Sequence, residues 1–397
     1  MTSQQVNITG VRDQGDHHPA EAAAGRTVFI DMLRVICVAW LVPFHTARIY
    51  DLWEINYVKS GATSAGLSAL IGLTGPWHMP FFFLLAGAST YLALTKRSGV
   101  EYARERTLRL LVPLLFGTAV LIPPQPYYAL LDHGTPPSSY AGFLAGYFTP
   151  DLRDLSGYYG TFTPAHLWFI LYLFLFSLLL LPLFLYLRKA SGAALVSRAA
   201  ALISSPAGAV LLVILLAATE LLPAPGGKNP FFYGIFFLGG FLFMADERLR
   251  RAAETRRRIA LATGLPAAFF VVAVWLSGPS LRGITPATVA FSLVRHYAGL
   301  ALVTAALGYG LRRLDGDRPW LPFAQEISFP FYILHQTVIV AAGYYIIRLV
   351  PAVYTGFLAI CALSFLVTAG LCAAARLTPV TRFLLGMKAL RPRQYRT

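Results

Sequence analysis

The chain has 397 residues, of which 56% are hydrophobic and only 13% are charged. Soluble domains carry about 25% charged residues, so this composition excludes an ordinary soluble protein and favours one embedded in a membrane. The net charge of +15 is spread over the ends of apolar segments, and this placement argues against a nucleic-acid partner.

Ten apolar segments follow one another along the chain, and most are long enough to cross the ~30 Å hydrocarbon core of a lipid bilayer. The sequence therefore predicts an all-α fold, a polytopic membrane helix bundle of about ten transmembrane helices. We expect a disordered polar tail over 1–25, one transmembrane domain over 26–376 and a basic tail over 377–397. The segments cover residues 27–49, 67–94, 108–124, 166–187, 200–222, 230–246, 258–277, 287–309, 322–348 and 352–375.

Lysine and arginine lie mostly on one side of the predicted bundle. The loops on the side of both termini hold 25 of the 33 Lys and Arg residues, and the opposite loops hold seven. Positively charged loops stay in the cytoplasm. We therefore expect both termini to be cytoplasmic, in a multi-pass protein of the cell inner (plasma) membrane. The run ERLRRAAETRRR is then a determinant of topology, with phosphate or lipid binding as the alternative.

The first segment carries three ionisable residues, Asp31, Arg34 and His45, although a charge in the bilayer centre costs about 2.5–3.5 kcal/mol or more. Eleven residues are close to three helical turns, so Arg34 and His45 share one face about 16 Å apart. Asp31 lies one turn before Arg34 and can pair with it. This stripe suits a substrate with an anionic head in the cytoplasm and a reactive tail reaching outward. The alternative is structural, a helix-end ion pair and a hydrogen-bonded interhelical histidine.

Two later segments add candidate residues at their ends. Arg106 and Arg109 open the third segment one turn apart, and guanidinium groups bind phosphate oxygens bidentately. Flanking charge that sets topology explains them equally well. His166 and Trp168 open the fourth segment at the predicted depth of His45, and an interfacial aromatic belt also explains the tryptophan.

The ninth segment contains ISFPFYILHQT, in which Ser328, Tyr332 and His335 follow the i, i+4, i+7 spacing of one helix face. His335 falls near the middle of the membrane, and His78 in the second segment reaches a similar depth. A buried histidine with a satisfied hydrogen bond is the alternative at both positions. Together, four membrane histidines and several buried arginines predict a polar cavity in the bundle.

These stretches, in this order, resemble the acyltransferase-3 family of integral membrane O-acyltransferases. The resemblance rests on DMLRVICVAWLVPFH, FFFLLAG, RTLRLLVP, HLWF and ISFPFYILH, which span residues 27–340. The first and fourth segments look nearest to the succinyltransferase-like branch that modifies periplasmic glucans. The resemblance implies cytoplasmic acyl-CoA (acetyl-CoA or succinyl-CoA) as donor, no metal, and a hydroxyl of a carbohydrate or other cell-envelope acceptor outside.

The family resemblance also implies roles for the candidate residues. Arg34, Arg106 and Arg109 hold the phosphates of coenzyme A, and the pantetheine arm threads the bundle. His45 acts as general base on the acceptor hydroxyl or briefly carries the acyl group, and Asp31 orients Arg34. Support for the acceptor or for the oxyanion is expected from His166, Trp168, Ser328, Tyr332 and His335.

A secondary transporter or exporter of a small polar solute is the competing interpretation, because charged helices broken at Pro and Gly also serve transport. The two halves of the chain show no likeness to each other, and most arginines lie on one side. Both observations favour the enzyme. The sequence names neither the acyl group nor the acceptor, and it leaves the oligomeric state open.

Overall fold

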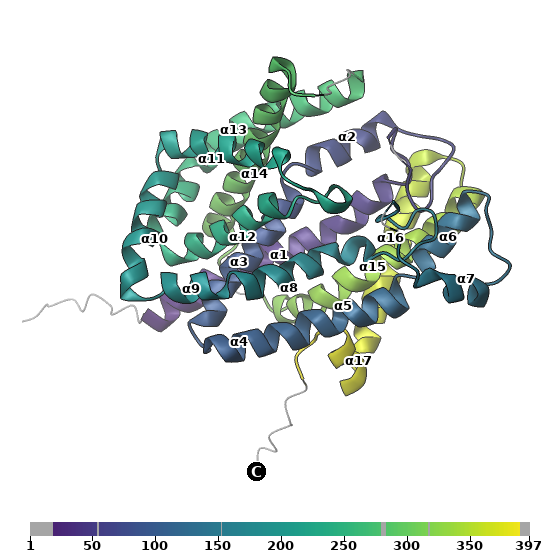
Figure 1. Cartoon of the computed structure of the whole chain (residues 1–397), viewed down its shortest axis with the longest axis horizontal. Coiled ribbons are helices and arrows are strands. Elements are labelled where there is room, and N and C mark those ends of the chain that lie inside the picture. The colour runs from purple at the N-terminus through teal and green to yellow at the C-terminus, as the bar shows by residue number, and fades with distance from the viewer. Residues whose placement is uncertain (1–18, 54, 152, 279–282, 317, 390–397) are drawn as a thin grey trace, which may run out of the picture.

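The computed structural model describes residues 19–53, 55–151, 153–278, 283–316 and 318–389. Every regular element in these residues is a helix, which confirms the predicted all-α class (Figure 1). The predicted tail over residues 1–25 lies largely outside the described residues, and its last part from Pro19 onward is helical. The predicted basic tail begins with the short helix α17 (Pro379–Leu384), and its last eight residues also lie outside the described ranges.

Seven helical stretches of the described chain are long and apolar enough to cross a membrane. Two pairs of helices qualify only when taken together, so there are seven to nine candidate spans, and the predicted number of about ten is not confirmed. The remaining apolar segment is α12 (Pro230–Ala245), whose 16 residues fall short of the ~20 that a full span needs. The seven are Val28–Ala47 within α1 (Pro19–Ala47), Ala65–Leu94, Gly99–Asp132, α13 (Glu247–Ser277), α14 (Pro286–Arg313), α15 (Leu321–Leu349) and α16 (Val353–Ala375).

Several stretches are built from more than one helix. Ala65–Leu94 consists of α2 (Ala65–Thr74) and α3 (His78–Leu94). Gly99–Asp132 contains π-helical turns at Thr107–Leu111 and Gly117–Leu121, which separate α4 (Gly99–Arg106), α5 (Val112–Phe116) and α6 (Pro124–Asp132). The short helix α7 (Tyr140–Tyr147) follows. The bent pairs are α8 (Trp168–Leu179) with α9 (Leu181–Leu187), at 51°, and α10 (Ala190–Ile203) with α11 (Pro206–Ala218), at 93°.

The sequence predicted one straight span over 200–222, and the structure turns sharply within it. Ser205 caps α11 by accepting a hydrogen bond from the backbone N–H of Gly208 at 2.9 Å. Pro206 has no N–H and fits the first turn of a new helix better than the middle of a continuing one. The connection between the predicted segments 166–187 and 200–222 is therefore largely helical, as part of α10.

Helix α1 runs through the middle of the bundle, and glycines on α14 and α15 receive side chains of α1 and of the turn that follows it. A Cβ atom added to Gly310 of α14 would lie 2.7 Å from Leu33 Cδ1. One added to Gly343 of α15 would lie 2.6 Å from Ile49 Cδ1. Small residues at such contacts let membrane helices approach closely. The candidate residues on α1 are thus held against α14 and α15.

A second close contact joins α3 to α12. A Cβ on Gly87 would lie 1.8 Å from the carbonyl oxygen of Phe237, and one on Gly240 would lie 1.8 Å from that of Leu84. The two backbones therefore touch with no side chain between them. This contact fixes the last turns of α3, which hold a hydrogen-bond partner of Arg34.

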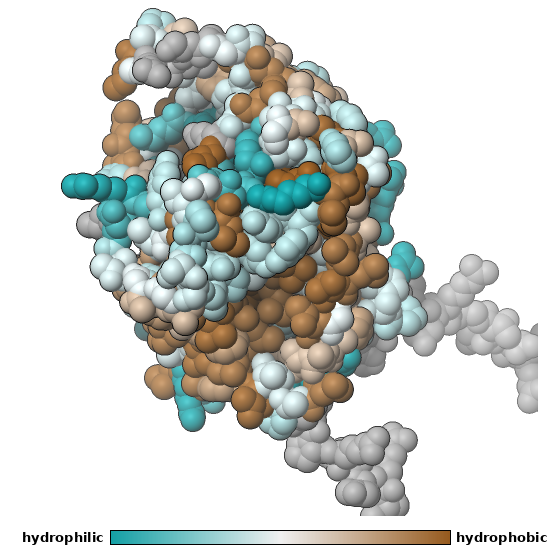
Figure 2. Space-filling view, turned by 90° about the vertical axis from the view of Figure 1, so that its right-hand side faces the viewer, coloured by the Kyte–Doolittle hydropathy of each residue, from teal (hydrophilic) through white to brown (hydrophobic). Residues whose placement is uncertain are grey.

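The bundle has two chemically different ends. Arg188, just after α9, donates to the carbonyl oxygen of Leu94 at the end of α3, and Arg248, near the start of α13, donates to Ser197 of α10. We call this end of the bundle, where α9 and α10 lie at the left of Figure 1, the basic end. The opposite end, at the right of Figure 1, carries α6, α7 and the loop over residues 48–64. Figure 2 shows this opposite end, with hydrophilic residues across its upper and middle part and hydrophobic residues below. Which end faces the cytoplasm stays a prediction.

Candidate active site in the bundle core

Three predicted histidines from distant parts of the chain meet in the core. His45 of α1 and His335 of α15 have ring centroids 5.2 Å apart, and His166, in a 3₁₀ turn before α8, lies 5.1 Å from His335. His335 is fully buried, whereas His45 is partly exposed. His45 also forms no hydrogen bond with the described residues. His45 is therefore the histidine of this cluster that a substrate can reach.

The hydrogen bonds fix where the protons of two rings lie. Nδ1 of His335 lies 2.7 Å from the carbonyl oxygen of Tyr332, which can only accept, so Nδ1 carries the proton. Its Nε2 is buried and has no partner among the described residues. Neutral His335 thus holds a free lone pair at Nε2. In His166 the pattern is reversed, because Nε2 donates to the carbonyl oxygen of Ile333 at 3.0 Å.

Backbone strain accompanies His166. Ala165 has a φ of +44°, the single positive φ of a non-glycine residue in the described ranges. This left-handed conformation costs an L-residue about 1–2 kcal/mol. The backbone N–H of Ala165 donates to Thr163 Oγ1 at 2.9 Å, which holds the turn. Strain of this kind concentrates at functional sites, and no motif in the sequence marked it.

The remaining residues that the sequence predicted for the acceptor or the oxyanion divide into two groups. Tyr332 belongs to the cluster, and its hydroxyl donates to the carbonyl oxygen of His166. Ser328 instead donates to Ala324 of its own helix at 2.6 Å. Trp168 packs 5.0 Å from Tyr233 in a separate aromatic group. The roles of all these residues stay predictions, and only Tyr332 shares the environment of the histidines.

His78 is a satisfied histidine beside the cluster. Its Nε2 donates to the carbonyl oxygen of Cys37 at 3.0 Å and ties α3 to α1. Phe44 lies between His78 and His45, with ring centroids 6.2 and 5.2 Å away. Although four histidines lie near one another, no group of three His, Cys, Asp or Glu residues in the described part of the chain could hold a metal ion.

A buried amide that sequence reasoning missed also contacts the cluster. Gln125 is fully buried, and its Nε2 lies 2.8 Å from Thr337 Oγ1 and 3.5 Å from His166 Nδ1. Its Oε1 has no partner among the described residues. A glutamine among three prolines, in a stretch that the sequence placed in a loop, gave no signal of this position.

At the basic end, the predicted pair of Asp31 and Arg34 is present. Nη1 of Arg34 lies 2.9 Å from Asp31 Oδ1, and Nη2 donates to Ser89 Oγ of α3 at 2.5 Å. The Arg34 side chain is 29% exposed, so an anion can reach it. The next residue of α3, Thr90, has its Oγ1 3.0 Å from the Tyr102 hydroxyl.

The π-helical turn at Thr107–Leu111 separates the contacts of two arginines that the sequence placed on one face. Arg106 lies over the Tyr102 ring at 4.8 Å, and its Nε is buried without a hydrogen-bond partner in the described chain. Arg109 instead pairs with Glu105 at 3.1 Å and donates to the carbonyl oxygen of Gly386 at 3.2 Å. The wider π turn rotates the following residues away from the α-helical spacing. Arg34 bonds to Ser89, its neighbour Thr90 contacts Tyr102, and Tyr102 lies under Arg106. This series of contacts links Arg34 to Arg106, whereas Arg109 turns to other partners.

The face of α1 between Arg34 and His45 is packed. Val38 and Leu41 occupy this face and are 6% and 2% exposed. A cavity of about 900 Å³ lies elsewhere, among α11, α12, α13 and α14. The structure thus places a cation and an imidazole on one stripe without showing an open passage between them in the described residues.

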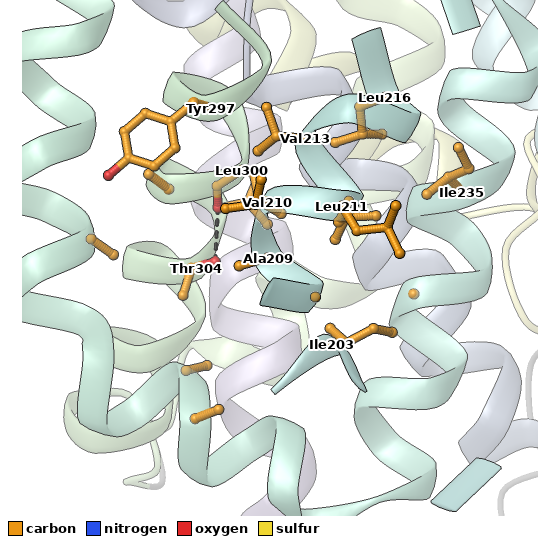
Figure 3. Close-up of a pocket in the computed structure, with 18 of the residues that line it drawn as sticks. Ile203, Ala209, Val210, Leu211, Val213, Leu216, Ile235, Tyr297, Leu300 and Thr304 are labelled. Carbon is orange, nitrogen blue, oxygen red and sulfur yellow. Dashed lines mark hydrogen bonds between the residues drawn. The ribbon is translucent and has the colours of Figure 1, made fainter. Parts of the chain in front are cut away.

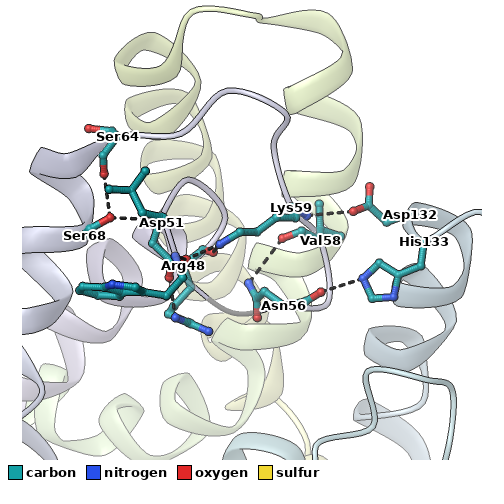
Figure 4. A network of polar contacts seen from close by, with 11 residues as sticks. Arg48, Asp51, Asn56, Val58, Lys59, Ser64, Ser68, Asp132 and His133 are labelled. Atoms are coloured by element: carbon teal, nitrogen blue, oxygen red, sulfur yellow. Dashed lines mark hydrogen bonds and ion pairs between the residues drawn. The ribbon is translucent and has the colours of Figure 1, made fainter. Parts of the chain in front are cut away.

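A polar network lies in the loop that follows α1, a few residues after His45 (Figure 4). Asp51 is fully buried, and it pairs with Arg48 at 2.5 Å and with the ammonium group of Lys59. The backbone N–H of Lys59 donates to Asp132 Oδ2 at 2.9 Å. Burial lowers the pKa of Lys59 below its usual value, and the bond to Asp51 opposes this. The network anchors the 48–64 loop to α6.

The segment between α7 and α8 also closes over this end. The Tyr57 hydroxyl donates to the carbonyl oxygen of Ser156 at 2.6 Å, and His133 Nε2 donates to that of Asn56 at 2.9 Å. These two contacts join the loop after α1 to the chain that follows α6 and α7.

The fold and the site define a multi-pass membrane protein with a histidine cluster buried among α1, α8 and α15 and a group of arginines at one end. The acyltransferase domain model matches residues 27–376, and the chain belongs to the acyltransferase-3 family. It is therefore a membrane acyltransferase. It is similar to glucans biosynthesis protein C of Salmonella typhi and of Salmonella typhimurium, each 24% identical over 364 residues that cover 86% of this chain and 89% of the relative. No solved structure matches the chain.

Proposed function

We propose that this protein transfers an acyl group from a coenzyme A thioester to a hydroxyl of a glucan on the outer side of the cell inner membrane. The family supports acyl transfer, and the name of the relatives, glucans biosynthesis protein C, supports a glucan acceptor. The observation that carries the proposal is the partly exposed ring of His45 against the buried, unpartnered Nε2 of His335.

The proton arrangement suits His45 as a general base. In the proposed state one nitrogen of His45 donates to Nε2 of His335, and its other nitrogen turns a lone pair toward the substrate. His335 is then a positioning residue, because its own proton is fixed on the carbonyl oxygen of Tyr332. A second group that orients the base is a recurring feature of enzymes that activate a hydroxyl.

The reaction balances with these groups alone. His45 takes the proton of the acceptor hydroxyl as its oxygen attacks the thioester carbonyl carbon. The tetrahedral intermediate collapses by breaking the carbon–sulfur bond, and the proton on His45 passes to the leaving thiolate. The products are a glucan ester and free coenzyme A. Such a base contributes ~10²–10⁴-fold, and positioning and oxyanion stabilisation supply the rest.

The donor end of the proposal uses the arginines. Arg34 and Arg106 bind phosphate groups of coenzyme A, since each has guanidinium surface or an N–H free for an anion. Arg109 can bind a phosphate beside them only if it gives up its ion pair with Glu105. Because Val38 and Leu41 are buried between Arg34 and His45, passage of the pantetheine arm requires the helices packed on them to separate. Acetyl-CoA and succinyl-CoA are both candidate donors.

Transfer in vesicles tests the function. Purified protein in liposomes, given labelled acetyl-CoA or succinyl-CoA on one side and a soluble glucan on the other, is expected to form labelled glucan ester. The ester should form only when the thioester is on the side of the basic end, which protease accessibility of the C-terminal tail identifies. Counterflow of a labelled solute without acyl-CoA, together with no ester from either donor, would overturn the proposal in favour of transport.

A further inference from the structure

A large apolar cavity lies away from the histidines, among α11, α12, α13 and α14 (Figure 3). Its volume is about 900 Å³, and four of its lining residues have polar side chains, Arg256, Thr263, Tyr297 and Thr304. The hydroxyls of Thr263 and Thr304 donate to carbonyls of their own helices, both at 2.8 Å, and that of Tyr297 donates to Thr263. The wall is thus effectively hydrocarbon.

The cavity exists because small residues face it. Gly239 of α12 has no atom within 4 Å of an added Cβ, whereas the neighbouring Gly240 touches the backbone of α3. Protein interiors are packed as densely as organic crystals and rarely leave voids of this size empty. An apolar wall of this kind also does not hold water. A hydrocarbon occupant therefore suits the cavity.

The cavity is long enough to cover one leaflet of a membrane. The lining runs from Leu249 to Thr263 on α13 and from Leu307 to Leu293 on α14. Fourteen residues of helix span about 21 Å, and one leaflet contributes about 15 Å of hydrocarbon. Both helices are candidate membrane spans, and Val210 on the α11 wall is 61% exposed, so the cavity opens sideways toward lipid.

Charge is placed unevenly along the cavity. Arg256 lies midway along the α13 lining, beside the turn before α11, where it donates through Nη2 to the carbonyl oxygen of Ser204 at 2.6 Å. Its other N–H groups have no partner in the described residues. The hydroxyl of Ser204 is buried and unpartnered as well. At the end formed by Leu293 and Val294, the neighbouring Arg295 pairs with Glu220. An anionic head therefore fits beside Arg256.

The turn that carries Ser204 has a shape that suits the membrane surface. The 93° bend turns α10 away from the direction of α11, as expected where a surface helix joins one that enters the bilayer. Arg256 belongs to the arginine-rich start of α13. We propose that this cavity binds an anionic glycerophospholipid, with its phosphate on Arg256 and an acyl chain along α11, α13 and α14. The site lies beyond the acyl-transfer function and does not depend on it.

Retention of lipid by the purified full chain tests the site. We expect wild-type protein in mild detergent to keep a bound phospholipid in native mass spectrometry and to rebind phosphatidylglycerol after delipidation. Gly239→Leu fills the cavity and should abolish both. Arg256→Ala should weaken rebinding about tenfold, the equivalent of ~1.4 kcal/mol. Gly370→Leu, at an open position on α16, and Arg251→Ala, whose side chain is 74% exposed, are matched controls that should behave as wild type.

Two results would overturn the site. One is wild type that neither retains nor rebinds phosphatidylglycerol, or that rebinds it equally after Gly239→Leu. The other is a wild-type dimer that Gly239→Leu dissociates, which would mean that a second copy occupies the cavity. Ala209→Phe, on the opposite wall, replaces Gly239→Leu if that variant fails to fold, and it must then abolish binding.

Discussion

Replacing His45 with glutamine is expected to lower the kcat of glucan acylation by ~10²–10⁴-fold, the usual contribution of a general base. Glutamine keeps a polar side chain of similar reach but cannot take up a proton at neutral pH. Because His45 is partly exposed and bonds to no described residue, the fold should persist. Initial rates of ester formation, normalised to folded protein, measure the effect.

His133→Gln is the matched control for His45. This histidine directly follows α6 and donates to the carbonyl oxygen of Asn56. The kcat of this variant is expected to stay within about twofold of wild type, because His133 contacts none of the groups proposed to react. A wild-type kcat for His45→Gln would remove this residue from the reaction.

The second large effect concerns stability. Gly240→Leu is expected to destabilise the protein by ~3 kcal/mol or more, the upper end for overpacking, because the new Cβ would lie 1.8 Å from the Leu84 carbonyl oxygen. Neither backbone can yield as a flexible side chain could, so α3 and α12 must separate. Thermal unfolding in detergent measures the loss.

The neighbouring glycine supplies the control for this effect. Gly239→Leu adds the same side chain one residue earlier on α12, where no atom lies within 4 Å of the new Cβ. It should leave the unfolding temperature nearly unchanged once lipid has been removed from both proteins. Equal destabilisation by the two substitutions would contradict the close contact of α3 with α12.

Hydropathy predicts most of the fold, because long apolar stretches in a bilayer must satisfy their backbone hydrogen bonds internally as helices. It fails at 200–222, where the apolar run continues through Ser204 and Ser205 but Pro206 starts a new helix. Hydropathy averages over such a turn. Local capping residues decide it, and a single serine–proline pair is a weak signal.

The candidate site could also be predicted only in part from the sequence. Helical periodicity places Arg34 and His45 on one stripe, and predicted depth brings His166 and His335 level with His45. The proton positions depend on tertiary contacts such as Nδ1 of His335 with Tyr332, which no spacing encodes. The π turn that redirects Arg109 is likewise invisible to a pattern that assumes 3.6 residues per turn.

Binding of the donor tests the central claim most directly. Acetyl-CoA and succinyl-CoA are titrated against delipidated wild type, Arg34→Ala and His45→Gln, with thermal stability as the readout. A ligand at 100 times its Kd stabilises a folded protein by ~2.7 kcal/mol. The account predicts that at least one thioester stabilises wild type and His45→Gln alike, and that Arg34→Ala loses the shift. Absence of any shift in wild type, or an undiminished shift in Arg34→Ala, would contradict a donor site at the basic end.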